Sequence, residues 1–298
     1  MHKIIPSGKK KATKLFALII LFFLILNAFK GYSQVYAGFN VGYSWGNPAS
    51  ATLGSNHSSI HNTDTVSIVA GSYGKGLPLA VTAGYQFNEH IAAELELEYF
   101  FGAGYQFRST YADSNSYSNY YVTTDNKISD ISMFRFNPAF KISTGNHVKI
   151  YMRLGVLISV AAKYASEYTF TDNSYGFLTG ISSYTTQDIS EKYSHGTALG
   201  FNGAAGAEYK ICNHVQLFGE ARFTSLSWAP AHSEVTKNII NGTDEIPLST
   251  TSQLQTDFVN DYTVTFPLDP SSPSKQFKHF VPFNSLGIKL GVVYLFGK

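Results

Sequence analysis

Residues 148–163 read VKIYMRLGVLISVAAK and contain the pattern that decides the fold. Every second residue from Val148 onward is apolar, and the positions between them carry Lys149, Arg153 and Lys163. Successive side chains of a β-strand point to opposite faces, so this segment predicts a strand with one uncharged face and one charged face.

Seven further segments after residue 33 show the same period of two, and we find no amphipathic helical pattern of useful length there. The eight predicted strands are Val35–Trp45, Leu77–Phe87, Ile91–Phe101, Ile131–Ile142, Val148–Lys163, Ala198–Ile211, Val215–Leu226 and Asn284–Phe296. All their charges can be assigned to one parity, and Pro138 predicts a bulge because proline removes a ladder donor. The predicted inner charges are Glu94, Glu96, Glu98, Glu208, Glu220, Arg135, Lys141, Lys149, Arg153, Lys163, Lys210, Arg222 and Lys289.

The connections between these strands alternate between short and long. The short ones are residues 88–90, 143–147 and 212–214, and the long ones are 46–76, 102–130, 164–197 and 227–283. This alternation is typical of an all-β, transmembrane up-and-down antiparallel β-barrel with short periplasmic turns and long extracellular loops. We therefore predict eight membrane-spanning strands.

Two other architectures remain open. A ten-stranded barrel is the alternative because Asn241-Gly242 marks a hairpin turn and residues 258–266 alternate again. A soluble sandwich or lipocalin would show the same alternation with its apolar face inside.

The first 33 residues predict a signal peptide. Five lysines precede an apolar run at residues 15–29, and small residues precede a cut before Gln34. A retained membrane anchor is the alternative. Residues 34–298 then form the outer-membrane barrel domain, located in the cell outer membrane. The whole chain has a net charge of +2, but without six leader lysines it has 16 bases against 20 acids, a net charge of −4. Without the leader, the chain has no excess of basic residues, which argues against nucleic-acid binding.

Several segments resemble the bacterial outer-membrane β-barrel domain family, more broadly the small OmpA/OmpX-type barrels. The segments are VYAGFNVGY at 35–43, AGYQF at 83–87, GAAGAEYKI at 203–211, VQLFGEARF at 215–223 and LGIKLGVVYLF at 286–296. The resemblance implies contact with outer-membrane lipid and lipopolysaccharide. It also implies recognition by the barrel-insertion machinery through a terminal aromatic residue, for which Phe296 is the candidate.

The interior of an eight-stranded barrel is just wide enough to be filled by side chains. Inner charges of both signs therefore predict a structural polar network rather than a binding site. Its predicted members are Glu94, Glu96, Glu98, Arg135, Lys149, Arg153, Glu208, Glu220, Arg222 and Lys289. The alternative is a narrow polar channel, as in a small porin or transport barrel for small polar or hydrophobic solutes.

The predicted loops are rich in Tyr, Ser and Asn, a composition that suits adaptable contact surfaces. The preferred function is therefore a non-enzymatic one, in surface interaction or envelope integrity, with an extracellular protein or glycan as the candidate ligand. Alternatively, the strands continue above the membrane and the tyrosines form cross-strand pairs.

No motif selects a catalytic, cofactor-binding or metal-binding residue. Gly42–Gly46 match Gly-x-Ser-x-Gly, but that motif needs a strand-to-helix turn. His90, His147, His214 and Cys212 lie at one predicted rim without zinc spacing. A barrel-embedded lipid hydrolase, acyltransferase or protease is the remaining alternative, and it would need a Ser/His/acid set near the outer rim. The candidate histidines for that alternative are His57, His61, His195, His232 and His279.

Overall fold

The computed structural model describes residues 34–47, 51–60, 63–114, 118–176, 180–263 and 269–296. The expected signal peptide, residues 1–33, lies outside the described residues, as do residues 264–266 of the alternating segment at 258–266. Within the described ranges, no helix is both long and apolar enough to cross a membrane.

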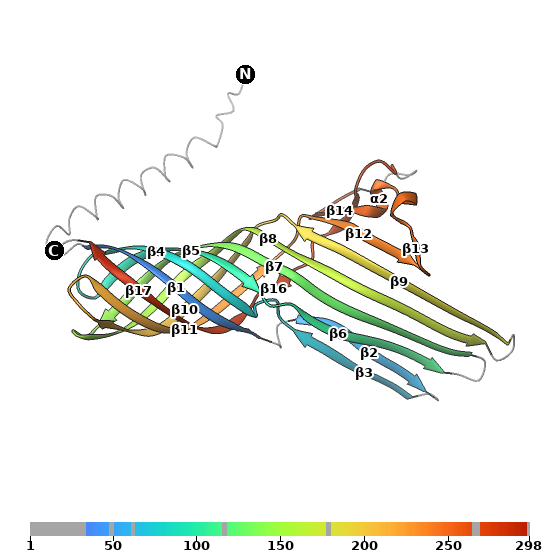
Figure 1. Cartoon of the computed structure of the whole chain (residues 1–298), viewed down its shortest axis with the longest axis horizontal. Coiled ribbons are helices and arrows are strands. Elements are labelled where there is room, and N and C mark those ends of the chain that lie inside the picture. Colours follow the sequence, from blue (N-terminus) through green and yellow to red (C-terminus); the bar gives the residue numbers. More distant parts are fainter. Residues whose placement is uncertain are drawn as a thin grey trace, which may run out of the picture.

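Eight strands pair in a closed cycle, called the ring below. They are β1 (Gln34–Gly46), β4 (Gly76–Gln86), β5 (Ile91–Gly102), β7 (Ser118–Thr144), β8 (Val148–Gly176), β10 (Ala198–Lys210), β11 (Val215–Trp228) and β17 (Ser285–Phe296). Each pairs antiparallel with the next in this order, and β17 pairs with β1. Each predicted strand segment lies largely within one of these strands, and Figure 1 shows the ring at the left of an elongated molecule.

Over the residues that the structure describes, the sheet holds seventeen strands rather than eight. The other nine are β2 (Ala51–Ile60), β3 (Thr63–Gly71), β6 (Tyr105–Ser114), β9 (Ile181–Ser194), β12 (His232–Ile240), β13 (Thr243–Asp244), β14 (Gln255–Val259), β15 (Ser274–Phe277) and β16 (Val281–Pro282). The segments predicted as long loops therefore contain much β-structure, as in the alternative where the strands continue. Strands β7 and β8 have 27 and 29 residues and run well beyond the ring.

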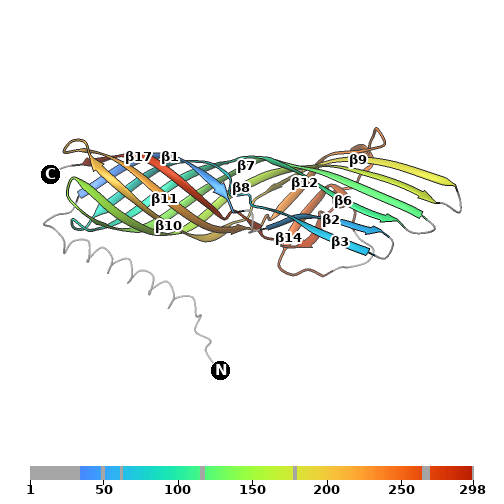
Figure 2. The same cartoon turned by 90° about the horizontal axis from the view of Figure 1, so that it is seen from below.

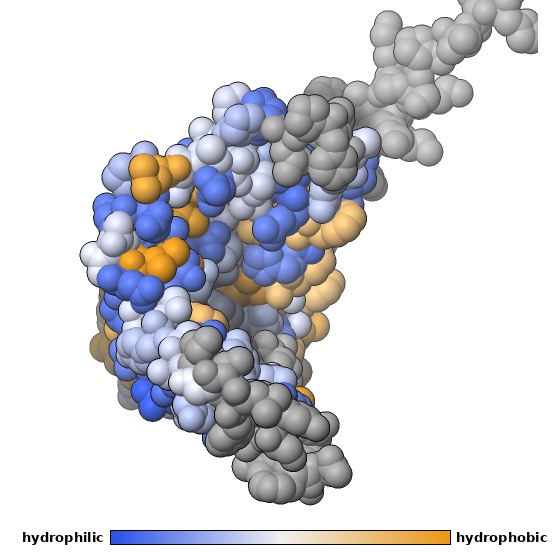
Figure 3. Space-filling view, turned by 90° about the vertical axis from the view of Figure 1, so that its right-hand side faces the viewer, coloured by the Kyte–Doolittle hydropathy of each residue, from blue (hydrophilic) through white to orange (hydrophobic). Residues whose placement is uncertain are grey.

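Beyond the ring these strands form a curved sheet, called the extension below. Its strands pair in the order β3–β2–β6–β7–β8–β9–β12–β14–β15. Figures 1 and 2 show it continuing the ring along the long axis of the molecule, and Figure 3, viewed from its tip, shows a hollow between its two sides. A short 3₁₀ turn, η2 (Ile246–Leu248), and helix α2 (Thr251–Leu254) lie beside β12 and β14.

The segments that suggested a ten-stranded barrel lie in the extension. Strand β12 pairs with β9, β13 and β14. In the described part of the chain, neither β12 nor β14 pairs with a ring strand, and β9 connects them to the part of β8 that runs beyond the ring. The hairpin expected at Asn241-Gly242 is present, with positive φ values of 47° and 85° at the two residues, as a two-residue hairpin turn requires.

Two bulges between β7 and β8 change which side chains point inward. One extra residue lies in β7 between Ser129 and Ser132, and Val160 is the extra residue in β8. Beyond Val160 the parity of β8 reverses, so Ala162 is buried and Lys163 is exposed. The prediction that Lys163 lies inside the ring is therefore wrong. The register does not shift at Pro138, so the bulge predicted there is also wrong.

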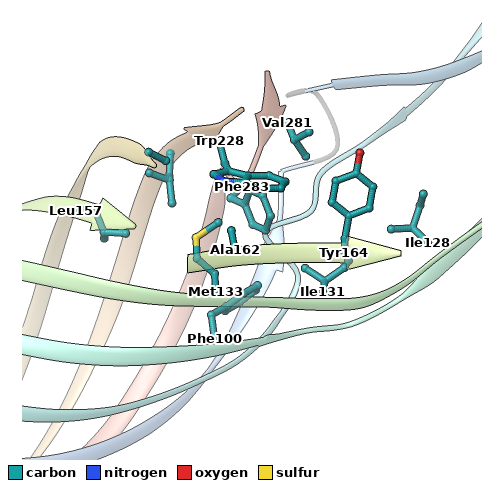
Figure 4. Packing of buried hydrophobic residues seen from close by; sticks show 12 residues of the cluster. Phe100, Ile128, Ile131, Met133, Leu157, Ala162, Tyr164, Trp228, Val281 and Phe283 are labelled. Carbon is teal, nitrogen blue, oxygen red and sulfur yellow. The ribbon is translucent and has the colours of Figure 1, made fainter. Parts of the chain in front are cut away.

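The interior of the ring has three layers. A small cluster of Tyr36, Ala92, Val293 and Leu295 lies at the end with the short turns, called the turn end. Charged side chains fill the middle, and a larger apolar cluster closes the end from which the extension leaves, called the extension end (Figure 4). In that cluster Phe100, Met133 and Leu157 have no exposed surface, and neither do Trp228 and Phe283.

Candidate functional site

Two adjacent glutamates on β5 lie at the centre of the buried charge network. Glu96 and Glu98 have no exposed surface. The Lys289 ammonium donates to Glu96 Oε1 at 3.1 Å and to Glu98 Oε2 at 2.7 Å, and Arg222 Nη1 donates to the same two carboxylates at 3.0 and 2.5 Å. Two carboxylates thus share two cations that come from β11 and β17. These shared ion pairs neutralise the two carboxylates and join three strands that are far apart in sequence.

Arg153 on β8 links this centre to acids nearer the turn end. Its guanidinium donates to Glu96 at 3.2 Å, to Glu94 at 3.3 Å and to Glu220 at 2.6 Å. The Tyr151 hydroxyl donates to the second oxygen of Glu220 at 2.8 Å. One arginine thereby connects β8 with β5 and β11 across the interior.

The two ends of the network also contact aromatic rings. At the extension end, Arg135 donates to Glu98 at 2.9 Å and lies 4.2 Å from the centroid of the Phe100 ring. At the turn end, Lys141 donates to Glu208 and lies 3.4 Å from Glu94. Glu94 also accepts a hydrogen bond from the Tyr36 hydroxyl at 2.5 Å.

Glycine makes room for two of these side chains. A Cβ at Gly42 would lie 2.6 Å from Lys289 Cγ, and a Cβ at Gly84 would overlap the ring of Tyr36. The network therefore depends on missing side chains as well as on charges.

Nine of the ten predicted network residues lie together, namely Glu94, Glu96, Glu98, Arg135, Arg153, Glu208, Glu220, Arg222 and Lys289. Lys149 does not join them: in the described part of the chain it has no ion pair, although it lines a small cavity beside Glu208. Lys141, placed on the inner face from the sequence, does take part. The network then has five acids and five bases, so its net charge is zero.

Little space remains around this network. Two interior cavities beside Tyr36, Lys141 and Glu208 measure about 20 and 10 Å³. A single water needs about 10–15 Å³, so each holds about one water. Buried ion pairs are costly unless well satisfied and add little stability relative to apolar packing.

The outer face of the ring is apolar. Leu154 and Leu199 are each 68% exposed, Phe201 is 65% exposed, and Leu290 and Ile150 are each 64% exposed. Aromatic pairs on alternate residues lie near both ends of the strands. Tyr43–Trp45 and Tyr99–Phe101 lie toward the extension end, and Tyr85–Phe87 and Tyr294–Phe296 toward the turn end. An apolar band between two aromatic belts is the surface that a lipid bilayer requires of a barrel.

The face of the extension that continues the interior of the ring is called the inner face, and it is aromatic. Tyr73 lies 5.5 Å from Tyr105 and 5.3 Å from Tyr164, measured between ring centroids, and Tyr164 stacks on Tyr193 at 4.5 Å. Farther out, Tyr111 lies 4.9 Å from the ring of His57 and 5.8 Å from that of Tyr120. Burial raises the pKa of Tyr193, and its hydroxyl donates to Glu191 at 2.6 Å, which raises that pKa further.

The opposite face of the extension, called the outer face, carries the cross-strand ion pairs. Arg108 pairs with Asp125 at 2.5 Å, Lys127 with Glu167 at 2.8 Å and Lys237 with Asp188 at 3.6 Å. The registers and bonds of the described strands place Asp172 and Glu191 on the inner face, and no Lys or Arg there. The two faces therefore differ in chemistry: the outer face carries ion pairs and lysines, whereas the inner face carries tyrosines and acids without lysine or arginine beside them.

Of the candidate histidines, His61 lies outside the described residues, and the described ones, His57, His195, His232 and His279, are not joined in a Ser–His–acid set. His232 Nδ1 lies 2.8 Å from Asp257 Oδ1, and Ser194 lies opposite His232 in the ladder. However, the Ser194 hydroxyl is bonded to His195 Nδ1 at 2.7 Å rather than to His232. His279 lies against Phe258 and Tyr193, and burial lowers its pKa. Among the described residues, no group of three His, Cys, Asp or Glu side chains is arranged to hold a metal ion.

Residues 16–244 match the family described as "Outer membrane protein beta-barrel domain". No curated protein sequence matches the chain significantly. Among solved structures, two of Ail, the attachment invasion locus protein of Yersinia pestis, are similar to it, one of them in complex with the heparin analogue sucrose octasulfate. They are 9% and 10% identical to this chain, and each match covers 89% of this chain and 97% of Ail with a TM-score of 0.28.

Proposed function

Because the chain belongs to the outer membrane β-barrel domain family, we propose that its eight ring strands span the outer membrane as a closed barrel. The observation that supports this most strongly is the inverted polarity of the ring, with leucines 68% exposed outside and glutamates with no exposed surface inside. In this proposal the short turns face the periplasm and the extension projects outside the cell. The leader at residues 1–33 directs export.

The proposed barrel is sealed rather than a channel. Its interior carries ten charges in mutual contact, and the apolar cluster at Phe100 and Trp228 closes the extension end. A passage for solutes would require these side chains to move together, which close packing and shared ion pairs resist. This disfavours the small-porin alternative.

The function of such a barrel then depends on the extension. We infer a non-enzymatic role in surface interaction, in which the inner face of the extension binds an extracellular protein or glycan. Tyrosines give wide contact area at low entropic cost, as in antibody paratopes. Since Asp172 and Glu191 lie there without a neighbouring Lys or Arg, the ligand surface should be neutral or cationic rather than polyanionic.

The test is binding by the full chain displayed on cells. Tyr111→Ala and Tyr168→Ala remove inner-face rings, because Tyr168 has the same parity on β8 as Tyr164 and Asp172. Thr171→Ala on the outer face of β8 is the matched control. We expect the two tyrosine variants to weaken adhesion to neutral glycan or basic protein surfaces and the control to leave it unchanged. Tight binding to a sulfated polysaccharide, unaffected by the tyrosine variants, would contradict the proposal.

A further inference from the structure

A second surface feature lies outside the barrel, where the extension leaves the ring. Between Ser159, which lies opposite Ala198 of β10, and Tyr164, which lies opposite Tyr193 of β9, strand β8 changes partners. A groove of about 540 Å³ lies beside this change of partners. It crosses β5, β7, β8, β9 and β12 and includes the aromatic belt residues Tyr99 and Phe101.

The bulge at Val160 places a lysine in this groove. Without the extra residue Val160, the parity of β8 would point Lys163 into the barrel. With it, Lys163 lies on the outer surface, in one groove with Lys192 of β9. Bulges commonly re-aim a side chain beside a functional site. Among the described residues neither ammonium has an ion-pair partner, unlike Lys127 and Lys237 on the same outer face.

The groove also carries acids. Asp130 and Glu234 line it, together with His232 and Ser194. Asp130 adopts a left-handed backbone conformation, with φ of 53°, which is unusual for a residue other than glycine. Two bases against two acids do not make a site for a simple anion. The combination suits a headgroup that carries a phosphate and an ammonium together.

We propose that this groove binds a membrane lipid with a phosphoethanolamine-type headgroup. The phosphate lies by Lys163 and Lys192, the primary ammonium by Glu234, which is directly opposite Lys192 in the β9–β12 ladder, and the acyl chains run along the apolar wall past Tyr99 and Phe101. The level of the groove fits this ligand, because aromatic belts lie at the headgroup region of a bilayer. The inference rests on the membrane position proposed for the ring, and it is independent of what the inner face of the extension binds.

The test is lipid binding by the full chain in neutral-detergent micelles, followed by native mass spectrometry. Phosphatidylethanolamine, phosphatidylglycerol and phosphatidylcholine with identical acyl chains are the probes. We expect the ethanolamine lipid to bind about tenfold more tightly than either of the others. A Lys163→Gln/Lys192→Gln variant should lose about 10- to 30-fold of that affinity, since each lysine near a lipid surface contributes about 1 kcal/mol.

Two further variants make the result specific. Glu234→Gln should abolish the preference for ethanolamine over glycerol. Lys275→Gln/Lys278→Gln removes two exposed charges that do not line the groove and should change affinity less than twofold. Equal or tighter binding of phosphatidylglycerol would overturn the proposal, as would unchanged binding by the groove variant. Displacement by soluble O-phosphoethanolamine at lipid-like concentrations would assign the groove to a free metabolite instead. Heat-dependent gel mobility of each variant reports separately whether the barrel has formed.

Discussion

At the scale of single residues, the interior charges were largely predictable because every second position of a strand must face the same way. Glu94, Glu96 and Glu98 follow that rule over one uninterrupted strand, and Arg153 does so on β8. Lys163 does not, because the bulge at Val160 lies in the run Val160-Ala161-Ala162. All three residues are small and apolar, so nothing in their pattern marks the change of face.

Removing one carboxylate charge from the centre of the network should be strongly destabilising. Glu98→Gln leaves Arg135, Arg222 and Lys289 with one acceptor charge fewer in a fully buried site. We expect the free energy of unfolding to fall by about 3–5 kcal/mol, measured by urea unfolding of the refolded barrel. Glu167→Gln is the control: it breaks an exposed pair with Lys127 and should cost about 1 kcal/mol or less. Equal losses in both variants would contradict the account of the network.

A charge on the outer face of the ring tests the lipid contact directly. Leu154→Lys places an ammonium in the middle of the apolar band, where it should cost about 2–4 kcal/mol and reduce the yield of inserted protein. Thr171→Lys, on the outer face of the extension, is the control and should insert normally. Insertion of both variants with the same yield would show that Leu154 does not face lipid.

At the scale of elements, the extension was harder to predict than the ring. Its strands alternate tyrosine with serine, threonine and asparagine, so neither face is apolar enough to give a clear signal of period two. The length of the last predicted loop was the one hint of further structure, since a structureless loop of more than 50 residues is unusual. The hairpin at Asn241-Gly242 was predictable because its backbone requires positive φ at both residues. The parallel pairing of β2 with β6 was not, because it joins distant segments through His57 and Tyr111.

The contact between the β14–β15 segment and β9 should weaken in acid. His279 lies against Phe258 and Tyr193, and burial lowers its pKa below the usual 6.5, although Glu191 opposes part of that shift. The unfolded chain therefore binds the proton more readily, so this contribution to stability is complete above pH 6.5 and declines as the pH falls. The titration of His279 by NMR should give a value below 6.5. His279→Gln should remove the corresponding pH dependence of local proteolysis, and a titration above 6.5 would contradict the packing described.

At the scale of the whole molecule, the ring and the extension have surfaces of different chemistry. The ring has an apolar exterior and an electrically neutral, closely filled interior, which suits it to hold a position in the membrane. The extension has a charged outer face and an aromatic inner face, which suits it to contact another molecule. The period of two in eight segments predicted the ring. The hollow inner face of the extension was not predictable in this way, because it depends on the curvature of the assembled sheet (Figure 3).

The central claim is that this barrel is sealed, and single-channel recording in a planar bilayer tests it most directly. The full chain, inserted and shown to be folded by its heat-dependent gel mobility, should give no stable conductance steps above the bare bilayer. An Arg153→Ala/Glu98→Ala variant, which removes two side chains from the interior network, should give at most brief, irregular openings. Stable conductance steps from the unmodified protein, with a size that changes in this variant, would contradict the claim and assign the barrel to transport.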